Sequence, residues 1–103
     1  MRMSTNLDCL ELKVGHIWYD TVDQPVIPIE VKNNCEKTVV VSIHVKSSDG
    51  RLLHKSSPFK LKSQEKKAYE IVVSYYGDAD VTGEWTTEDA INWRPIKAVR
   101  VKL

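Results

Sequence analysis

The segment Thr38-Val39-Val40-Val41-Ser42-Ile43-His44-Val45-Lys46 shows the clearest alternation of apolar and polar side chains in the chain. Its odd-numbered positions from 39 to 45 are all apolar, and its many β-branched residues favour an extended backbone. Successive side chains of a strand point to opposite faces of a sheet. The alternation therefore predicts a strand with one buried face.

The same period of two recurs in six further segments, at residues 10–14, 27–32, 59–62, 69–75, 81–85 and 97–103. Polar turn segments separate them, including 33–37, 63–67 and the hairpin signal Asp49-Gly50. About seven short strands with turns between them are typical of a β-sandwich. We therefore expect one all-β domain over residues 1–103, an antiparallel immunoglobulin-like β-sandwich in which residues 51–62 form one kinked strand.

Two local features qualify this prediction. Pro25 and Pro28 indicate that the second strand begins at an edge or a bulge, because proline cannot donate to a strand ladder. The best candidate for a short helix is the segment 87–92, which Thr87 would cap and which would end before Arg94-Pro95.

The composition excludes several classes of protein. The 103 residues include 15 Lys and Arg and 14 Asp and Glu, a net charge of +1 that argues against a polyanion binder driven by bulk charge. Two cysteines and three scattered histidines do not make a zinc site, so we expect no metal and no cofactor. No apolar run has the length of a leader or a membrane span, so we expect a soluble cytoplasmic protein.

Several of these features occur together in residues 27–74. They are Ile29-Glu30-Val31-Lys32-Asn33-Asn34, the strand at 38–46, the Asp49-Gly50 turn, and Leu61 followed by Gln64-Glu65 and the segment 68–73. Together they resemble the FxLYD-type bacterial immunoglobulin-like modules. The resemblance implies an immunoglobulin-like fold, a bacterial source and an accessory role. The chain departs from that pattern in having Ser63-Gln64-Glu65 at the usual Pro-Gly-Glu connector.

Charge is uneven along the chain. Residues 51–67 carry six basic side chains and one acidic one, whereas residues 78–89 carry five acids and no Lys or Arg. The basic run could form a nucleic-acid-binding face, but lysines on an edge strand such as Lys60 and Lys62 also prevent sheets from pairing edge to edge. Asp78-x-Asp80 lacks the further ligands of an EF-hand, so we interpret it as a turn.

No catalytic motif is present. The sequence has no Gly-x-Ser-x-Gly elbow, no Gly-rich phosphate loop and no HExxH. We therefore expect a non-catalytic binding module whose partner is a protein, with no catalytic residues. Two alternatives remain open: a small hydrolytic enzyme with an unrecognised site, and a nucleic-acid binder that uses the basic 51–67 face.

The predicted recognition surface lies at one end of the sandwich. Strands that alternate up and down bring the loops 33–37, 63–67 and 87–95 together, with the acidic loop facing the basic connector. The candidate binding residues are Asn34, Lys66, Glu88, Asp89, Trp93 and Arg94. Trp93 either supplies an interface anchor or closes the open end of the core, and both interpretations remain open.

Two further expectations concern pairing. If residues 7–14 pair antiparallel with 26–33, Cys9 lies near Cys35, as thiols in a reducing cytosol or as a disulfide in an exported form. The terminal strand at 96–103 has no later residues to cover its edge, so we expect a weak homodimer through that edge.

Overall fold

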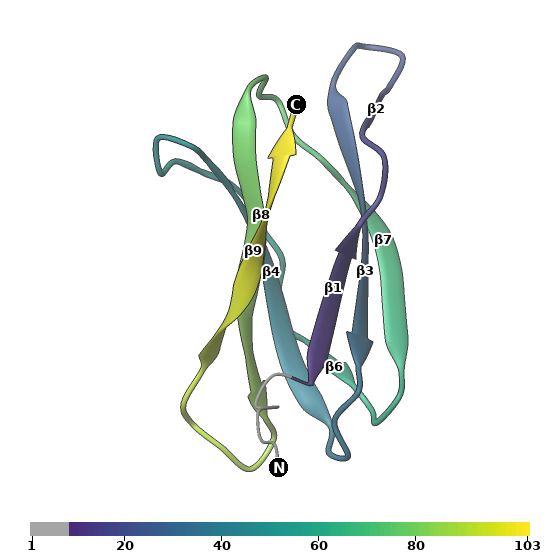
Figure 1. Ribbon diagram of the computed structural model, residues 1–103, viewed down its shortest axis with the longest axis vertical. Helices are drawn as coiled ribbons and strands as arrows, with labels where there is room; N and C mark the ends of the chain where they lie inside the picture. The colour runs from purple at the N-terminus through teal and green to yellow at the C-terminus, as the bar shows by residue number, and fades with distance from the viewer. Residues whose placement is uncertain (1–8) are drawn as a thin grey trace, which may run out of the picture.

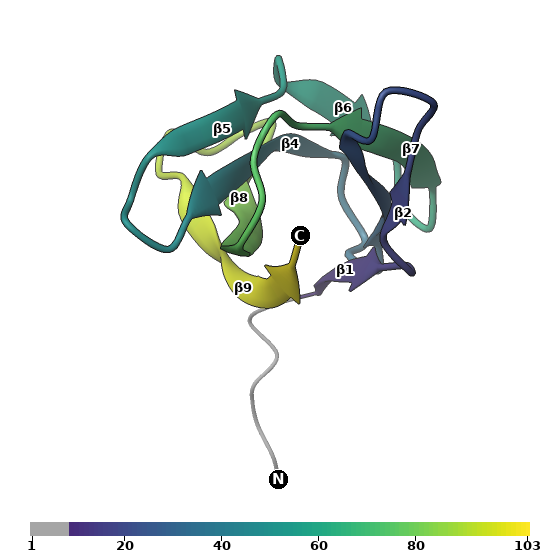
Figure 2. The same cartoon turned by 90° about the horizontal axis from the view of Figure 1, so that it is seen from above.

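The computed structural model describes residues 9–103. The start of the first predicted strand, at residues 7 and 8, and the expectation about a leader at the N-terminus lie outside the described residues. Residues 9–103 form two antiparallel sheets that pack face to face (Figures 1 and 2). The prediction of an all-β antiparallel sandwich is confirmed.

The first sheet is built around β3 (Pro25–Asn33), which pairs with β7 (Lys66–Val72) along one edge. Along its other edge β3 pairs with both β1 (Leu10–Val14) and β2 (Trp18–Tyr19). β1 and β2 therefore act as one strand that is interrupted between them. The β1–β3 pairing is antiparallel, as expected, with Leu10 opposite Asn33.

The second sheet has β4 (Val39–Ser47) and β8 (Asp78–Thr87) at its centre and β9 (Arg94–Lys102) at one edge. β5 (Leu52–Lys55) and β6 (Phe59–Leu61) share the other edge of β4. They are the two halves of the kinked strand predicted at 51–62. The structure thus has more separate strands than predicted, because the kinked strand at 51–62 is interrupted and because the short strand β2 was not expected.

Pro28 explains the interruption between β1 and β2. β3 is a central strand, so the expectation that it begins at an edge or bulge is wrong. β1 ends opposite Ile29 and β2 starts opposite Val26, which leaves Pro28 facing the gap between them. There Gly15 N donates to Pro28 O at 2.8 Å, and the missing N–H of proline disrupts no ladder.

The predicted short helix at 87–92 is also absent. Thr87 ends β8, and Ala90 N donates to Thr87 O at 3.1 Å, which closes a single turn. β9 starts at Arg94, so too few residues remain for a second turn. The described part of the chain contains no helix long and apolar enough to span a bilayer.

The core lies between the inner faces of the two sheets. Val39, Val41, Ile43 and Val45 of β4 are fully buried, as their alternation predicts. Ile27, Ile29 and Val31 of β3 and Ile71 of β7 lie in the same core from the other sheet. Leu61, Val81 and Trp85 join it from the sheet of β4 itself. Burial of these side chains is the main source of stability, and it fixes which face of each strand points inward.

Candidate binding site at the loop end

Three loops lie together at one end of the sandwich, the lower end in Figure 1. They join β3 to β4 (34–38), β6 to β7 (62–65) and β8 to β9 (88–93). We call this part of the molecule the loop end. The up-and-down order of the strands predicted this clustering, and contacts between the loops show it directly.

Asn33 connects two of the loops from a fully buried position at the end of β3. Its backbone N donates to Glu65 O at 2.9 Å. Its side-chain Nδ2 donates to Lys37 O at 2.8 Å and to Leu61 O at 3.0 Å, and its Oδ1 accepts from Cys35 N at 2.8 Å. One buried amide thus satisfies three backbone groups and fixes the shape of the loop end.

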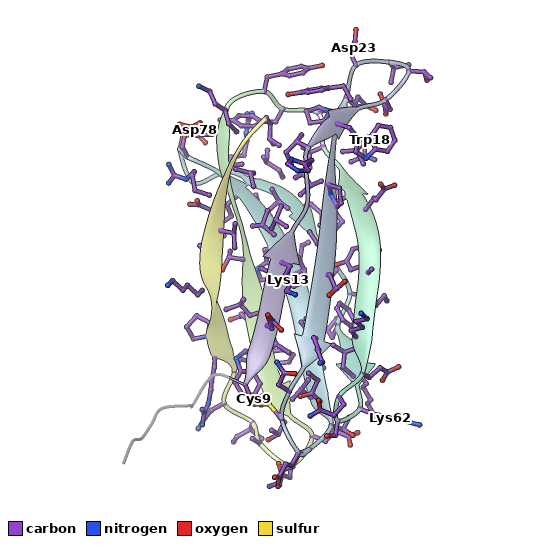
Figure 3. All side chains as sticks on the ribbon, turned by 45° about the vertical axis from the view of Figure 1, so that its right-hand side comes forward. Cys9, Lys13, Trp18, Asp23, Lys62 and Asp78 are labelled. Atoms are coloured by element: carbon purple, nitrogen blue, oxygen red, sulfur yellow. A yellow bond between two sulfur atoms is a disulfide. The ribbon has the colours of Figure 1, made fainter. Side chains whose placement is uncertain are left out.

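A disulfide between Cys9 and Cys35 fastens the start of β1 to the β3–β4 loop (Figure 3). The two Cα atoms lie 5.1 Å apart, which confirms the predicted proximity. Asn34 N donates to Cys9 O at 3.0 Å, and Ser63 Oγ donates to Cys35 O at 2.7 Å. The bridge is therefore held on both sides by loop residues.

A cavity of about 530 Å³ opens beside this disulfide. Trp85, which is only 4% exposed, forms part of its wall, together with Thr86, Ala90 and Arg94. The Cζ atom of Arg94 lies 5.5 Å from the centroid of the Trp85 ring. Trp85 Nε1 is buried and has no hydrogen-bond partner within residues 9–103. The cavity thus combines an aromatic surface with two cationic side chains, Arg94 and Lys37, and one carboxylate, that of Glu36.

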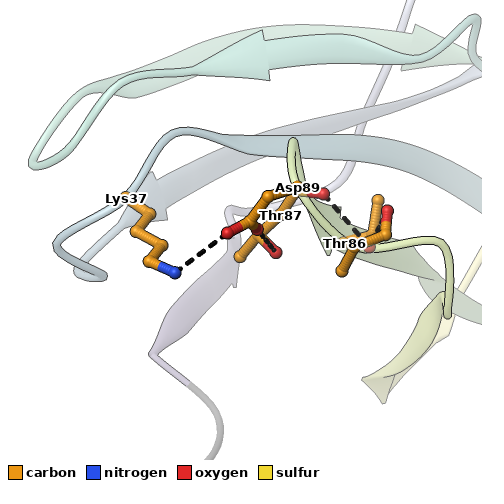
Figure 4. Close-up of polar contacts among 5 residues, drawn as sticks. Lys37, Thr86, Thr87 and Asp89 are labelled. Carbon is orange, nitrogen blue, oxygen red and sulfur yellow. Dashed lines mark hydrogen bonds and ion pairs between the residues drawn. The ribbon is translucent and has the colours of Figure 1, made fainter.

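The acidic side chains of the β8–β9 loop are already paired. Asp89 Oδ2 lies 3.1 Å from Lys37 Nζ, and its Oδ1 accepts from Thr87 Oγ1 at 2.7 Å (Figure 4). The Thr87 hydroxyl and then Lys37 lower the pKa of Asp89. Glu88 Oε2 lies 2.8 Å from Lys60 Nζ and raises the pKa of that amine. In contrast, Arg94 forms no ion pair with any described carboxylate.

The predicted site residues divide into two groups. Asn34 and Arg94 line the cavity. Glu88 and Asp89 lie at the same end and line a smaller depression beside Lys37. Their lysine partners come from β6 and from the β3–β4 loop, and neither acid forms an ion pair with the 63–67 connector within residues 9–103. Lys66 starts β7 opposite Lys32 and does not line the cavity.

Trp93 does not line the cavity either. It keeps 42% of its surface exposed, whereas Trp85 is the tryptophan that packs into the core. The exposure of Trp93 fits a side chain on the outer rim of the loop end.

Sequence reasoning missed the residues that shape this site. Asn33 shares the inward parity of Ile29 and Val31, and this pattern could have identified it as a buried polar residue. The positions of Thr86 and Lys37 depend on how the loops meet, and no local pattern encodes that arrangement.

Ser42 and His44 form the closest pairing of a hydroxyl with an imidazole on the outer face of β4. Ser42 Oγ lies 3.2 Å from His44 Nε2 and also donates to Ser56 O at 3.0 Å. Because a hydroxyl carries one proton, Ser42 accepts from His44 in this arrangement, so the imidazole does not act as its base. Residues 9–103 contain no group of three or more His, Cys, Asp or Glu placed to hold a metal ion.

Comparison with known proteins identifies the fold alone. No family model and no curated protein matches the sequence. Among solved structures, a Bordetella pertussis protein provisionally assigned as ApaA superposes with a TM-score of 0.59 at 15% identity, covering 91% of this chain and 93% of its own. A second structural-genomics target superposes with a TM-score of 0.51 at 13% identity, covering 90% of this chain and 84% of its own. The chain therefore has the overall architecture of these proteins over most of its length.

Proposed function

We propose that this chain is a non-catalytic binding module that holds an acidic segment of a partner protein at its loop end. The observation that carries the proposal is the cavity of about 530 Å³ in which Arg94 borders the ring of Trp85. Arg94 has no carboxylate partner among the described residues, so its guanidinium can donate hydrogen bonds to a carboxylate of a partner protein. The neighbouring ring of Trp85 offers apolar surface to the methylene groups of the partner's Asp or Glu side chain.

The surroundings of the cavity support this role. The disulfide and the Asn33 hydrogen bonds hold the loops in place, so little conformational freedom is lost when a partner binds. Trp93 lies next to Arg94 in sequence and adds exposed aromatic surface at the rim. Tryptophan and arginine are the residue types that most often anchor protein interfaces.

The experiment selects binders from a random-peptide library on the immobilised full chain and then measures the affinity of the best peptides by calorimetry. We expect these peptides to contain Asp or Glu. Arg94→Ala should weaken them by about tenfold or more, and Trp93→Ala should weaken them while changing the stability by less than about 1 kcal/mol.

Arg100→Ala is the matched control, because Arg100 is an exposed arginine that pairs with Asp80 on β8. Peptides that bind the Arg94 and Arg100 variants equally well would refute the assignment of the site.

The nucleic-acid alternative draws less support from the structure. Lys60 pairs with Glu88, Lys67 Nζ lies 4.4 Å from the centroid of the Phe59 ring, and Arg51 lies over Tyr75. Half of the six basic side chains of the 51–67 run thus contact the chain's own groups. Retention on a DNA column that weakens steeply with salt would favour this alternative.

A further inference from the structure

The end of the sandwich opposite the loop end carries a surface of exposed aromatic rings. Trp18 is 45% exposed, Tyr19 47% and Tyr76 61%. The centroids of the Tyr19 and Tyr76 rings lie 6.4 Å apart with 12° between their planes. Figure 3 shows Trp18 and Asp23 at this end, far from Cys9 and Lys62. We call the surface formed by Trp18, Tyr19, Val22 and Tyr76 the aromatic end.

Hydrogen bonds hold this surface in shape. Asp20 Oδ1 accepts from Val22 N at 3.0 Å and from Gln24 N at 2.8 Å, which closes the turn between β2 and β3. The hydroxyl of Tyr76 donates to Asp23 O and so ties the segment after β7 to the same turn. The rings are thus fixed before any partner arrives, which reduces the entropy cost of binding.

Three acidic residues near the rings, Asp20, Asp23 and Glu70, have no ion-pair partner among residues 9–103. Trp18 Nε1 donates to Glu70 Oε2 at 3.0 Å, and Asp20 and Asp23 lie in the adjoining turn. The ion pairs of residues 9–103 involve Glu11, Asp80, Glu88 and Asp89, and none of these three acids. The sequence has no Lys or Arg between Lys13 and Lys32, nor between Lys67 and Arg94.

The rings of the aromatic end also lack a cation of their own. Within the described chain, basic side chains lie over the rings of Tyr75, Phe59, Tyr69 and Trp85. Among residues 9–103, no basic side chain lies over the ring of Trp18, Tyr19 or Tyr76. The faces of these rings are electron-rich and attract cations, most strongly for tryptophan.

We propose that the aromatic end is a second interaction surface, which binds a basic segment of a partner protein. A Lys or Arg side chain lies on the face of Trp18 with its charge directed toward Glu70, on the outer face of the first sheet. Charge complementarity argues for this occupant, because Asp20, Asp23 and Glu70 would repel an acidic peptide or an anionic lipid surface.

The test follows the indole and amide signals of the full chain by ¹H–¹⁵N NMR during titration with a tetralysine peptide. We expect tetralysine to shift the Trp18 indole signal while that of Trp93 stays unchanged, and a tetraglutamate peptide to leave the Trp18 signal where it is. Glu70→Gln keeps an acceptor for Trp18 Nε1 but removes the charge, and it should weaken tetralysine binding by at least about threefold.

Glu84→Gln is the matched control, because it removes one exposed acid from the other sheet and should leave the affinity unchanged within error. Equal weakening by both variants would show diffuse attraction and overturn the proposal. It would also be overturned if the Trp18 signal responded to maltotetraose or to phosphatidylcholine vesicles and not to tetralysine.

Discussion

Asn33 shows how a single residue can organise one end of a β-sandwich. Its side chain makes three hydrogen bonds to backbone groups, at Lys37, Leu61 and Cys35, and none of its surface is exposed. An apolar replacement would leave those groups without partners, and the bonds to Leu61 O and from Cys35 N are buried. The cost of an unsatisfied buried group is about 1–3 kcal/mol.

We therefore expect Asn33→Ala to lower the free energy of unfolding by roughly 3 kcal/mol or more. Urea denaturation monitored by tryptophan fluorescence would measure the change. Asn34→Ala is the control, since Asn34 is exposed and its side chain makes only a 3.5 Å contact with Glu11. Equal effects of the two substitutions would contradict this account of Asn33.

Gln64 is a residue whose backbone conformation raises the free energy of the folded state. Its φ is 67°, in the left-handed region, where a Cβ atom is unfavourable. We expect Gln64→Gly to stabilise the protein by up to about 1 kcal/mol, because glycine occupies this region without strain. Thermal unfolding would measure the gain.

Gly50 provides the reciprocal control for this prediction. Its φ is 90° and a Cβ there would meet nothing within 4 Å, so Gly50→Ala tests backbone conformation alone and should destabilise by about 1 kcal/mol. A loss of stability in Gln64→Gly would mean that the connector depends on the glutamine side chain.

At the scale of elements, the disulfide joins β1 to the loop after β3 across 26 residues of sequence. A loop of that size removes chain entropy from the unfolded state worth about 3–4 kcal/mol. We expect Cys9→Ser, Cys35→Ser and thiol reduction of the unsubstituted chain to lower the stability by similar amounts. Unchanged stability after complete reduction, verified by mass, would contradict this.

The pairing of β4 with β5 brings His44 and His54 onto neighbouring strands. Burial lowers the pKa of both imidazoles below the ordinary value of 6.5, although Glu84 opposes this at His44. The folded state therefore disfavours the protonated form, so stability is fully present above the ordinary pKa and declines as the pH falls below it.

Urea midpoints at about pH 7 and about pH 5 should differ in that direction, with the lower midpoint at the lower pH. His54→Leu should reduce the difference, whereas His16→Gln, at an exposed position, should preserve it. An unchanged pH dependence in His54→Leu would remove this histidine from the explanation.

The strands show what the sequence could and could not predict. The alternation of apolar and polar residues predicted β3 and β4, because each strand has one buried and one more polar face. The same alternation predicted which of their residues lie in the core. The gap between β1 and β2 escaped prediction because it depends on what lies opposite, which is Pro28 of β3. The cavity escaped it for the same reason, since Trp85, Cys35 and Arg94 come from three separated segments that meet only in the folded chain.

At the scale of the whole molecule, the sandwich is elongated, with extents of 46 × 26 × 24 Å, and its two ends differ in chemistry. Arg94 borders a cavity at the loop end, whereas the exposed ring of Trp18 lies beside the carboxylate of Glu70 at the other. The net charge of +1 does not show this difference between the two ends. One end that binds acidic segments and another that binds basic segments would allow the module to bind two partners at once. They would also allow copies of the chain to stack head to tail.

The edges of the sheets favour another mode of self-association. β9 is the longest edge strand with nine residues and β7 has seven, while β1, β2, β5 and β6 are short and interrupted. We predict a weak homodimer in which two β9 strands pair about a two-fold axis. Such a contact closes at two copies, whereas head-to-tail stacking would continue to grow with concentration. Sedimentation equilibrium over a concentration series separates the two modes.

The exposed Ala98 near the middle of β9 offers a specific variant for this prediction. Ala98→Lys would place like charges close together at the two-fold contact, in addition to Lys97, and should shift the equilibrium to monomer. Glu70→Gln at the aromatic end should leave a β9 dimer intact but weaken a head-to-tail stack, because it removes an acid that such a stack would use. A monomer at every concentration would exclude both modes, and masses that increase without limit would exclude the closed dimer.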